Sequence, residues 1–208
     1  HEVDAHFVGH PLLDAISDLK EIDIDQFKAE NNLNQKEIIA LLPGSREQEV
    51  TKMLELMLSV RPNFQEYQFV IAGAPSLPKE FYQKFVDENV HFVSNKTYDL
   101  LRCSKAALVT SGTATLETAL LNIPEVVCYR SSRISYEIGK RVVKNIKYIS
   151  LVNLIMDREV VTELIQKELN TENLVKELQQ ILEGEKREKI LQDFELLREK
   201  LGGKGASD

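Results

Sequence analysis

Short runs of apolar residues alternate along this chain with segments in which apolar residues recur every three or four positions. The apolar runs have the length of buried strands. They are residues 38–42, 69–73, 90–93, 106–109, 124–129 and 148–151. After the first run, Val50, Met53, Leu54, Met57 and Leu58 mark one face of a helix. Apolar strands separated by amphipathic helices predict a doubly wound α/β fold with a Rossmann-like parallel sheet.

The pattern also divides the chain into three parts. Residues 1–20 are predicted to be the remnant of a linker, and residues 21–184 to form the α/β domain. From Val160 to Leu201 the sequence is charged and predicted to be helical, with breaks near Asn170 and Gly184. Residues 185–208 would then be a C-terminal helix and a flexible tail.

A candidate anion site follows the strand predicted at residues 106–109. The next residues, 110–117 (TSGTATLE), lead from this strand into a helix. The N–H groups in the first turn of a helix have no partner within it, and the peptide dipoles make this end positive. Gly112 would let a ligand approach the backbone, and the hydroxyls of Ser111, Thr113 and Thr115 could donate to phosphate oxygens. Glu117, one turn later, could accept hydrogen bonds from a ribose diol. The simpler alternative is that Ser111 or Thr113 only caps the helix.

A second corner of the same kind follows the strand predicted at residues 38–42. Gly44, Ser45 and Arg46 lie between this strand and the next helix, and the Arg46 guanidinium could bind a phosphate through two hydrogen bonds. The spacing matches neither GxxxxGK[ST] nor GxGxxG. Because ligands of doubly wound sheets bind at the carboxyl ends of the strands, we expect both corners to converge on one anionic ligand.

The loop after the last predicted strand adds two candidates at the same edge, Asn153 and Arg158. Its simpler interpretation is a connection in which Asp157 caps the following helix.

Composition and charge argue against several classes of function. The 208 residues carry a net charge of −7, which argues against a nucleic-acid partner. No apolar run approaches the roughly 20 residues that span a bilayer. Cys103 and Cys128 are predicted to be free thiols, and the histidines have no metal-ligand spacing, so no metal is expected. Residues 130–147 are rich in Lys and Arg, which indicates either a solvated helix or a surface for anionic headgroups.

Five segments closely resemble the carboxyl-terminal half of the bacterial lipid-A-disaccharide synthase family. In the expected order, they are residues 8–12 (VGHPL), 41–46 (LLPGSR), 110–117 (TSGTATLE), 126–130 (VVCYR) and 148–163 (YISLVNLIMDREVVTE). One departure is Val152, where the family usually has a proline before the asparagine. That change alters the stiffness of the loop and leaves the side-chain groups in place.

The resemblance implies the C-terminal domain of a two-domain GT-B glycosyltransferase, an inverting hexosyltransferase whose carboxyl-terminal half holds UDP. The family transfers 2,3-diacylglucosamine from UDP-2,3-diacylglucosamine to 2,3-diacylglucosamine 1-phosphate (lipid X) and releases UDP, with no required metal or other cofactor. It works in the cytoplasm as a peripheral enzyme on the inner membrane of Gram-negative bacteria. The residues implied as donor contacts are Gly44, Ser45, Arg46, Ser111, Gly112, Thr113, Asn153 and Arg158, with Glu117 as the ribose-binding carboxylate.

The resemblance also implies what this chain lacks. The acceptor site and the acidic general base of the family belong to the amino-terminal domain, so no catalytic residue is assigned here, and the chain is expected to bind UDP without catalysing transfer alone. The missing domain, a membrane surface and a second copy of the chain are the expected partners. In this scaffold the final helix, residues 185–201, could be loose or exchanged between chains. The alternatives are half of a UDP-sugar epimerase or a non-catalytic module that binds a nucleotide or a protein partner.

Overall fold

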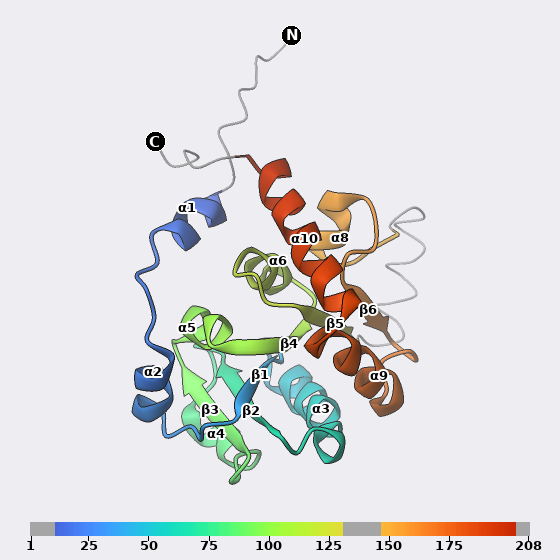
Figure 1. Cartoon of the computed structure of the whole chain (residues 1–208). Helices are drawn as coiled ribbons and strands as arrows, with labels where there is room; N and C mark the ends of the chain where they lie inside the picture. Colours follow the sequence, from blue (N-terminus) through green and yellow to red (C-terminus); the bar gives the residue numbers. More distant parts are fainter. Residues whose placement is uncertain (1–10, 131–146, 203–208) are drawn as a thin grey trace.

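The structure, a computed structural model, describes residues 11–130 and 147–202 (Figure 1). Within these residues six strands form one sheet in the order β3-β2-β1-β4-β5-β6, and every neighbouring pair is parallel. The strands are β1 (Glu37–Leu42), β2 (Tyr67–Gly73), β3 (Val90–Ser94), β4 (Ser104–Thr110), β5 (Glu125–Tyr129) and β6 (Thr162–Ile165). The predicted doubly wound α/β fold is therefore confirmed.

Helices connect the strands and cover the sheet. They are α1 (Pro11–Ser17), α2 (Ile24–Glu30), α3 (Glu47–Leu58), the 3₁₀ turn η1 (Arg61–Asn63), α4 (Lys79–Gln83), α5 (Thr97–Arg102), α6 (Thr113–Leu120), α8 (Leu151–Met156), α9 (Thr171–Leu182) and α10 (Glu185–Lys200). The helices predicted after the two glycine corners are present as α3 and α6.

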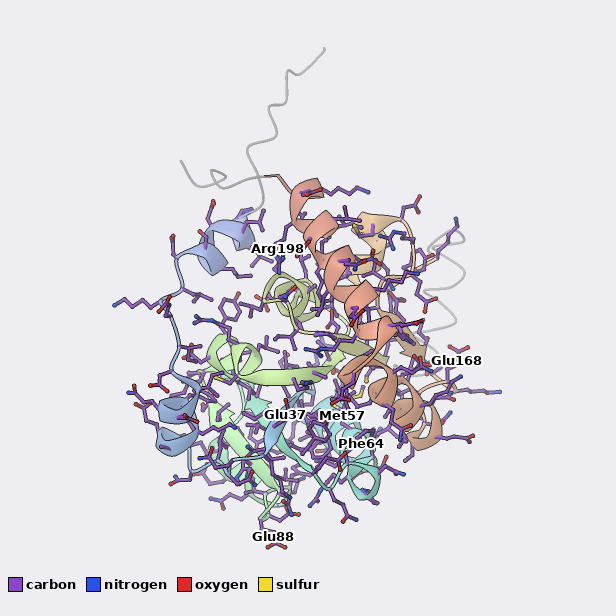
Figure 2. All side chains as sticks on the ribbon, viewed as in Figure 1. Glu37, Met57, Phe64, Glu88, Glu168 and Arg198 are labelled. Atoms are coloured by element: carbon purple, nitrogen blue, oxygen red, sulfur yellow. The ribbon has the colours of Figure 1, made fainter. Side chains whose placement is uncertain are left out.

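The two faces of the sheet contribute to two apolar layers, which explains the continuous apolar runs. In β1, Ile39 and Leu41 belong to one buried cluster, whereas Ile38 and Ala40 belong to the other. Figure 2 shows Met57 among the side chains between α3 and the sheet, and this residue is fully buried. Because neighbouring residues of a strand point to opposite faces, a strand covered on both sides must be apolar throughout.

The last strand was predicted in the wrong place. Residues 148–151 do not form a strand, because Ser150 caps α8 by accepting a hydrogen bond from the Asn153 N–H. The sixth strand is instead β6, within the segment that was predicted to be helical. Among the described residues β6 pairs only with β5, at the edge of the sheet, and two of its four residues, Thr162 and Glu163, are polar, so it lacks the apolar run that marked the other strands.

The final helix α10 packs into the main apolar layer. Ile190, Phe194 and Leu197 are buried there, and α10 contacts α6, α8 and α9. Its last turn lies near α1, at the same end of the molecule (Figure 1). The division into residues 1–20, 21–184 and 185–208 stays a prediction, but α10 is not loose in this structure.

Candidate functional site

The two predicted corners lie side by side. Strands β1 and β4 are neighbours, with Leu42 opposite Val109, so the residues that follow each strand reach the same edge of the sheet. A Cβ placed on Gly44 would lie 3.9 Å from Cγ2 of Thr110. Gly44 has a φ of +97°, a backbone conformation that other residues rarely adopt. The switch in strand order between β1 and β4 thus brings the corners together.

A cleft of about 320 Å³ lies where these corners meet. Its walls include Gly44 and Ser45 from the first corner and residues 110–114 from the second. The end of β2 and the loop that follows it add a third wall, residues 72–75. The Ser76 hydroxyl fixes this loop by donating to the Ser45 carbonyl at 2.9 Å. The cleft is therefore built from the carboxyl ends of three adjacent strands.

Two helices begin at this edge of the sheet. In the part of the chain that the structure describes, neither the N-cap of α3, Arg46, nor the N-cap of α6, Gly112, makes a side-chain capping hydrogen bond. Both N-termini consequently present backbone N–H groups and the positive end of a helix dipole without a protein acceptor from the cap. This arrangement is suited to binding an anion with several oxygens, such as a diphosphate.

A second cleft, of about 600 Å³, adjoins the first and shares Thr110 and Ser111 with it. Among the described residues that line this cleft, the cations Arg46, Lys52 and Arg130 outnumber the acidic side chain of Glu49. Arg46 pairs with Glu49 at 3.3 Å, but its side chain is 81% exposed, so an exposed pair of this kind holds it weakly. The surroundings of the shared residues are thus positively charged.

Thr110 is a candidate that the sequence did not single out. Its Oγ1 atom is buried at the junction of the two clefts and has no hydrogen-bond partner among the described residues. Buried hydroxyls nearly always have a partner, so the unpartnered Thr110 hydroxyl beside the two clefts is a potential additional hydrogen-bonding group. Its place directly before Ser111 and Gly112 was the available signal.

Ser111, Gly112 and Thr113 lie at the cleft, but they differ in what they offer. The Ser111 hydroxyl donates to the Ile149 carbonyl at 3.2 Å, so its proton is engaged within the protein. Gly112 is exposed with a φ of +150°, and a Cβ placed on it would meet nothing within 4 Å. The approach to its backbone is therefore open. Thr113 is exposed in the first turn of α6.

Glu117 lies one helical turn after Thr113, on the same face of α6. It accepts a hydrogen bond of 2.9 Å from the Tyr98 hydroxyl on α5. Burial, together with this hydrogen bond and the charge of Glu117, raises the pKa of Tyr98 to about 12, so the phenol stays protonated and keeps donating. The ribose-binding role of Glu117 stays a prediction, with Tyr98 as the group that orients it.

Asn153 does not lie among the cleft residues, and its side chain has a structural task. It is fully buried; its amide group donates to Val161 O and Glu163 Oε1, and its oxygen accepts from Val160 N and Val161 N. These bonds tie α8 to the segment that leads into β6. No donor or acceptor of this side chain is left for a phosphate, which argues against the predicted donor contact.

Arg158 is likewise engaged elsewhere. Its guanidinium forms two hydrogen bonds of 2.7 Å with the Asp193 carboxylate on α10. This hydrogen-bonded pair raises the pKa of Arg158 and connects the end of α8 to α10. Neither cleft described above includes Arg158, so the structure does not place it with the two corners.

The remaining predictions concern the basic segment, the two cysteines and membrane-spanning helices. Of the basic segment 130–147, only Arg130 and Lys147 belong to the described residues, and the rest lies outside them. Cys103 and Cys128 are free thiols, and burial raises the pKa of both. Among residues 11–130 and 147–202, no helix is both long and apolar enough to span a bilayer.

Comparison with known proteins identifies the family. The model of the lipid-A-disaccharide synthetase family matches residues 1–208. The chain belongs to this family. The lipid-A-disaccharide synthase of Syntrophus aciditrophicus strain SB is 37% identical over 217 residues, which cover 99% of this chain and 56% of that relative. The enzyme of the same name from Francisella philomiragia is 32% identical, with coverage of 96% and 55%. The resemblance inferred from the sequence is confirmed, and the chain spans about half the length of these curated relatives.

Solved structures show the fold of this lipid-A-disaccharide synthase family member to be that of GT-B proteins. A putative UDP-N-acetylglucosamine 2-epimerase from Listeria monocytogenes superposes with a TM-score of 0.57 at 17% identity, over 89% of this chain and 46% of that one. The S. aureus MnaA–UDP structure gives 0.56 at 16% identity, over 96% and 50%. TarM gives 0.52 at 16% identity, over 84% and 33%. At such identities, the likeness establishes the fold and does not assign a function.

Proposed function

We propose that this chain is the donor-binding half of a lipid-A-disaccharide synthase and that it holds the UDP part of UDP-2,3-diacylglucosamine. The observation that carries the proposal is the meeting of two helix N-termini, without side-chain caps, at the contact between Gly44 and Thr110. Family membership supplies the chemistry. The complete enzyme would transfer the 2,3-diacylglucosamine unit to 2,3-diacylglucosamine 1-phosphate, invert the anomeric centre and release UDP.

In this proposal the site stabilises the leaving group. As the bond to the anomeric carbon breaks, negative charge grows on the diphosphate, where the first N–H groups of α3 and α6 and the exposed Arg46 guanidinium can neutralise it. The backbone donors of the two helices and the Arg46 cation would meet that charge, so we expect no metal cofactor. The Thr110 hydroxyl would add a hydrogen bond at the junction of the clefts.

The attack itself needs a general base to remove the proton of the acceptor hydroxyl. We propose that this base and the acceptor site lie in the half of the relatives that the chain does not match, so that this chain binds UDP and does not transfer sugar alone. We further propose that the complete enzyme acts on lipid substrates as a peripheral protein at the cytoplasmic face of the inner membrane. Release of UDP by this chain supplied with both lipid substrates would contradict its inactivity.

A glycine substitution tests the nucleotide site directly. Gly112→Ala is expected to weaken UDP binding by about tenfold. Alanine is strained at a φ of +150°, so the backbone should shift and move the first N–H groups of α6, and the added methyl group lies at the cleft. Calorimetry with UDP, UMP and ADP measures the affinity and the preference for UDP.

The chain offers a matched control in Gly184→Ala. Gly184 has a φ of +85°, also precedes a helix and also has nothing within 4 Å of an added Cβ. It should cost similar stability and leave UDP affinity unchanged. Equal losses of UDP affinity in Gly112→Ala and Gly184→Ala would contradict the assigned site. If the unsubstituted chain binds no nucleotide at all, the alternative of a non-catalytic partner-binding module is favoured.

Substitutions of Arg158 and Arg46 should have opposite effects on stability and on UDP affinity. Arg158→Ala is expected to lower the free energy of unfolding by about 1–2 kcal/mol, because the buried Asp193 loses its two-bond partner, and to leave UDP affinity unchanged. Arg46→Ala should weaken UDP binding and leave stability unchanged, because the side chain is 81% exposed. Chemical denaturation and calorimetry on both variants make the comparison. If Arg158→Ala weakened UDP binding without lowering the free energy of unfolding, Arg158 would be a ligand contact after all.

A further inference from the structure

Glu163, on the edge strand β6, holds the start of α8. Its Oε2 accepts from the Ile149 N–H at 2.9 Å, and its Oε1 accepts from the Ser150 N–H at 2.9 Å, the Ser150 hydroxyl at 2.7 Å and the Asn153 amide at 2.9 Å. One carboxylate thus receives four hydrogen bonds from three residues of a single connection. Bonds from several donors to a carboxylate fix a loop more strongly than neutral pairs do.

The connection held by Glu163 also contacts the anion corner. The Ile149 carbonyl accepts the hydrogen bond from the Ser111 hydroxyl at 3.2 Å, and the Ser111 N–H donates to the Cys128 carbonyl at 3.3 Å. Ser111 directly precedes Gly112, whose backbone sets the direction in which α6 begins. A continuous set of hydrogen bonds therefore runs from the carboxylate of Glu163 through the peptide unit that joins Ile149 to Ser150, and on to Ser111, the residue before the N-cap of α6.

We propose that Glu163 is a positioning residue for the anion corner: it fixes the Ile149 carbonyl, which in turn fixes Ser111 and the first N–H groups of α6. The effect on ligand binding rests on the function proposed above, whereas the effect on the corner itself does not. Glu163 touches no ligand in this scheme. Its contribution is to keep the donors of α6 in place before the diphosphate arrives, which avoids the cost of ordering them during binding.

The ligand-free protein provides the first test. Glu163→Gln keeps the shape of the side chain but replaces one acceptor oxygen by an NH₂ group, which cannot accept from the Ile149 or Ser150 N–H. We expect the backbone amide resonances of Ser111, Gly112 and Thr113 to shift in nuclear magnetic resonance spectra of this variant. Unchanged resonances at these three residues would overturn the proposal.

The matched control is Glu177→Gln on α9. Glu177 accepts hydrogen bonds from Thr162, the neighbour of Glu163 on β6, and from Lys186, but it has no bond to residues 149–150. This variant should disturb the same edge strand and leave the amides of residues 111–113 unchanged. If Glu163→Gln does not fold, Ser150→Ala removes one of the four bonds and should produce a smaller shift of the same amides.

A double-mutant cycle then tests the route to the ligand. Glu163→Gln and Ser111→Ala are each expected to weaken UDP affinity by about fivefold, and the double variant by little more than either one, because both break the same connection. Independent, multiplicative losses would show that Glu163 does not act through Ser111. If the unsubstituted chain binds no UDP, the proposed function fails, and the amide resonances still decide whether Glu163 positions the corner.

Discussion

Replacing Phe194 by alanine is expected to lower the free energy of unfolding by about 3–5 kcal/mol. Phe194 lies in the middle of α10, is fully buried and belongs to the same apolar cluster as the strands. Removing its ring would leave a cavity among groups from several elements that cannot all move to fill it. Chemical denaturation followed by circular dichroism measures the change.

Leu196→Ala is the control for this prediction. Leu196 lies two residues away on the same helix, but it is 48% exposed, so its truncation should change stability by less than about 1 kcal/mol. The comparison separates packing of α10 from changes in helix propensity. A small effect of Phe194→Ala, equal to that of Leu196→Ala, would show that residues 185–201 are loose in solution.

Replacing Glu125 by methionine is expected to raise the free energy of unfolding by about 1–3 kcal/mol at neutral pH. Glu125 begins β5, is fully buried, and neither carboxyl oxygen has a hydrogen-bond partner among the described residues. Burial, and then the nearby charge of Glu163, raises the pKa of Glu125 well above its ordinary value of 4.5. Methionine fills a similar volume and needs no partner.

The same substitution should change how stability depends on pH. Because the pKa of Glu125 is higher in the folded chain, the folded state binds a proton that the unfolded state releases above about pH 4.5. The stabilising contribution of this proton is complete below pH 4.5 and is lost as pH rises toward the folded pKa. The advantage of Glu125→Met over the unsubstituted chain should therefore widen as pH increases.

Glu125→Gln separates the effect of titration from the effect of burying polar atoms without partners. Glutamine cannot titrate, so this variant should also lose the dependence on pH, but it keeps unpartnered polar atoms and should gain less stability than methionine. Thermal unfolding of the three proteins from acidic to neutral pH makes the comparison. A constant difference between Glu125→Met and the unsubstituted chain across this range would show that Glu125 does not titrate as the structure implies.

Local sequence patterns predicted most of the fold because buried parallel strands are apolar on both faces. Residues 38–42 and 106–109 could hardly occupy any other environment, and they form the central strands β1 and β4. The pattern failed at the edge of the sheet. Residues 148–151 are apolar but lead into α8, whereas the polar β6 becomes a strand only because β5 offers it a partner.

The residues of the candidate site also fall into those that the sequence could identify and those that it could not. Gly44 and Gly112 were identifiable because a glycine between a buried strand and a helix marks a sharp turn, and parallel strands bring such turns to one edge. Asn153 and Arg158 were not interpretable from their own loop. Their side chains are engaged by residues from β6 and α10, 10 and 35 positions away in the chain.

The sequence by itself determined the positions of strands β1 to β5, the two glycine corners and the family, since each depends on residues close together in the chain. Only the tertiary structure decided which polar side chains have hydrogen-bond partners within the protein. It assigned Asn153, Arg158 and the Ser111 hydroxyl to partners within the protein and left the Thr110 hydroxyl without one among the described residues. The physical reason is that a hydrogen bond is settled by distance in space, and neighbours in space are fixed only when the whole chain packs.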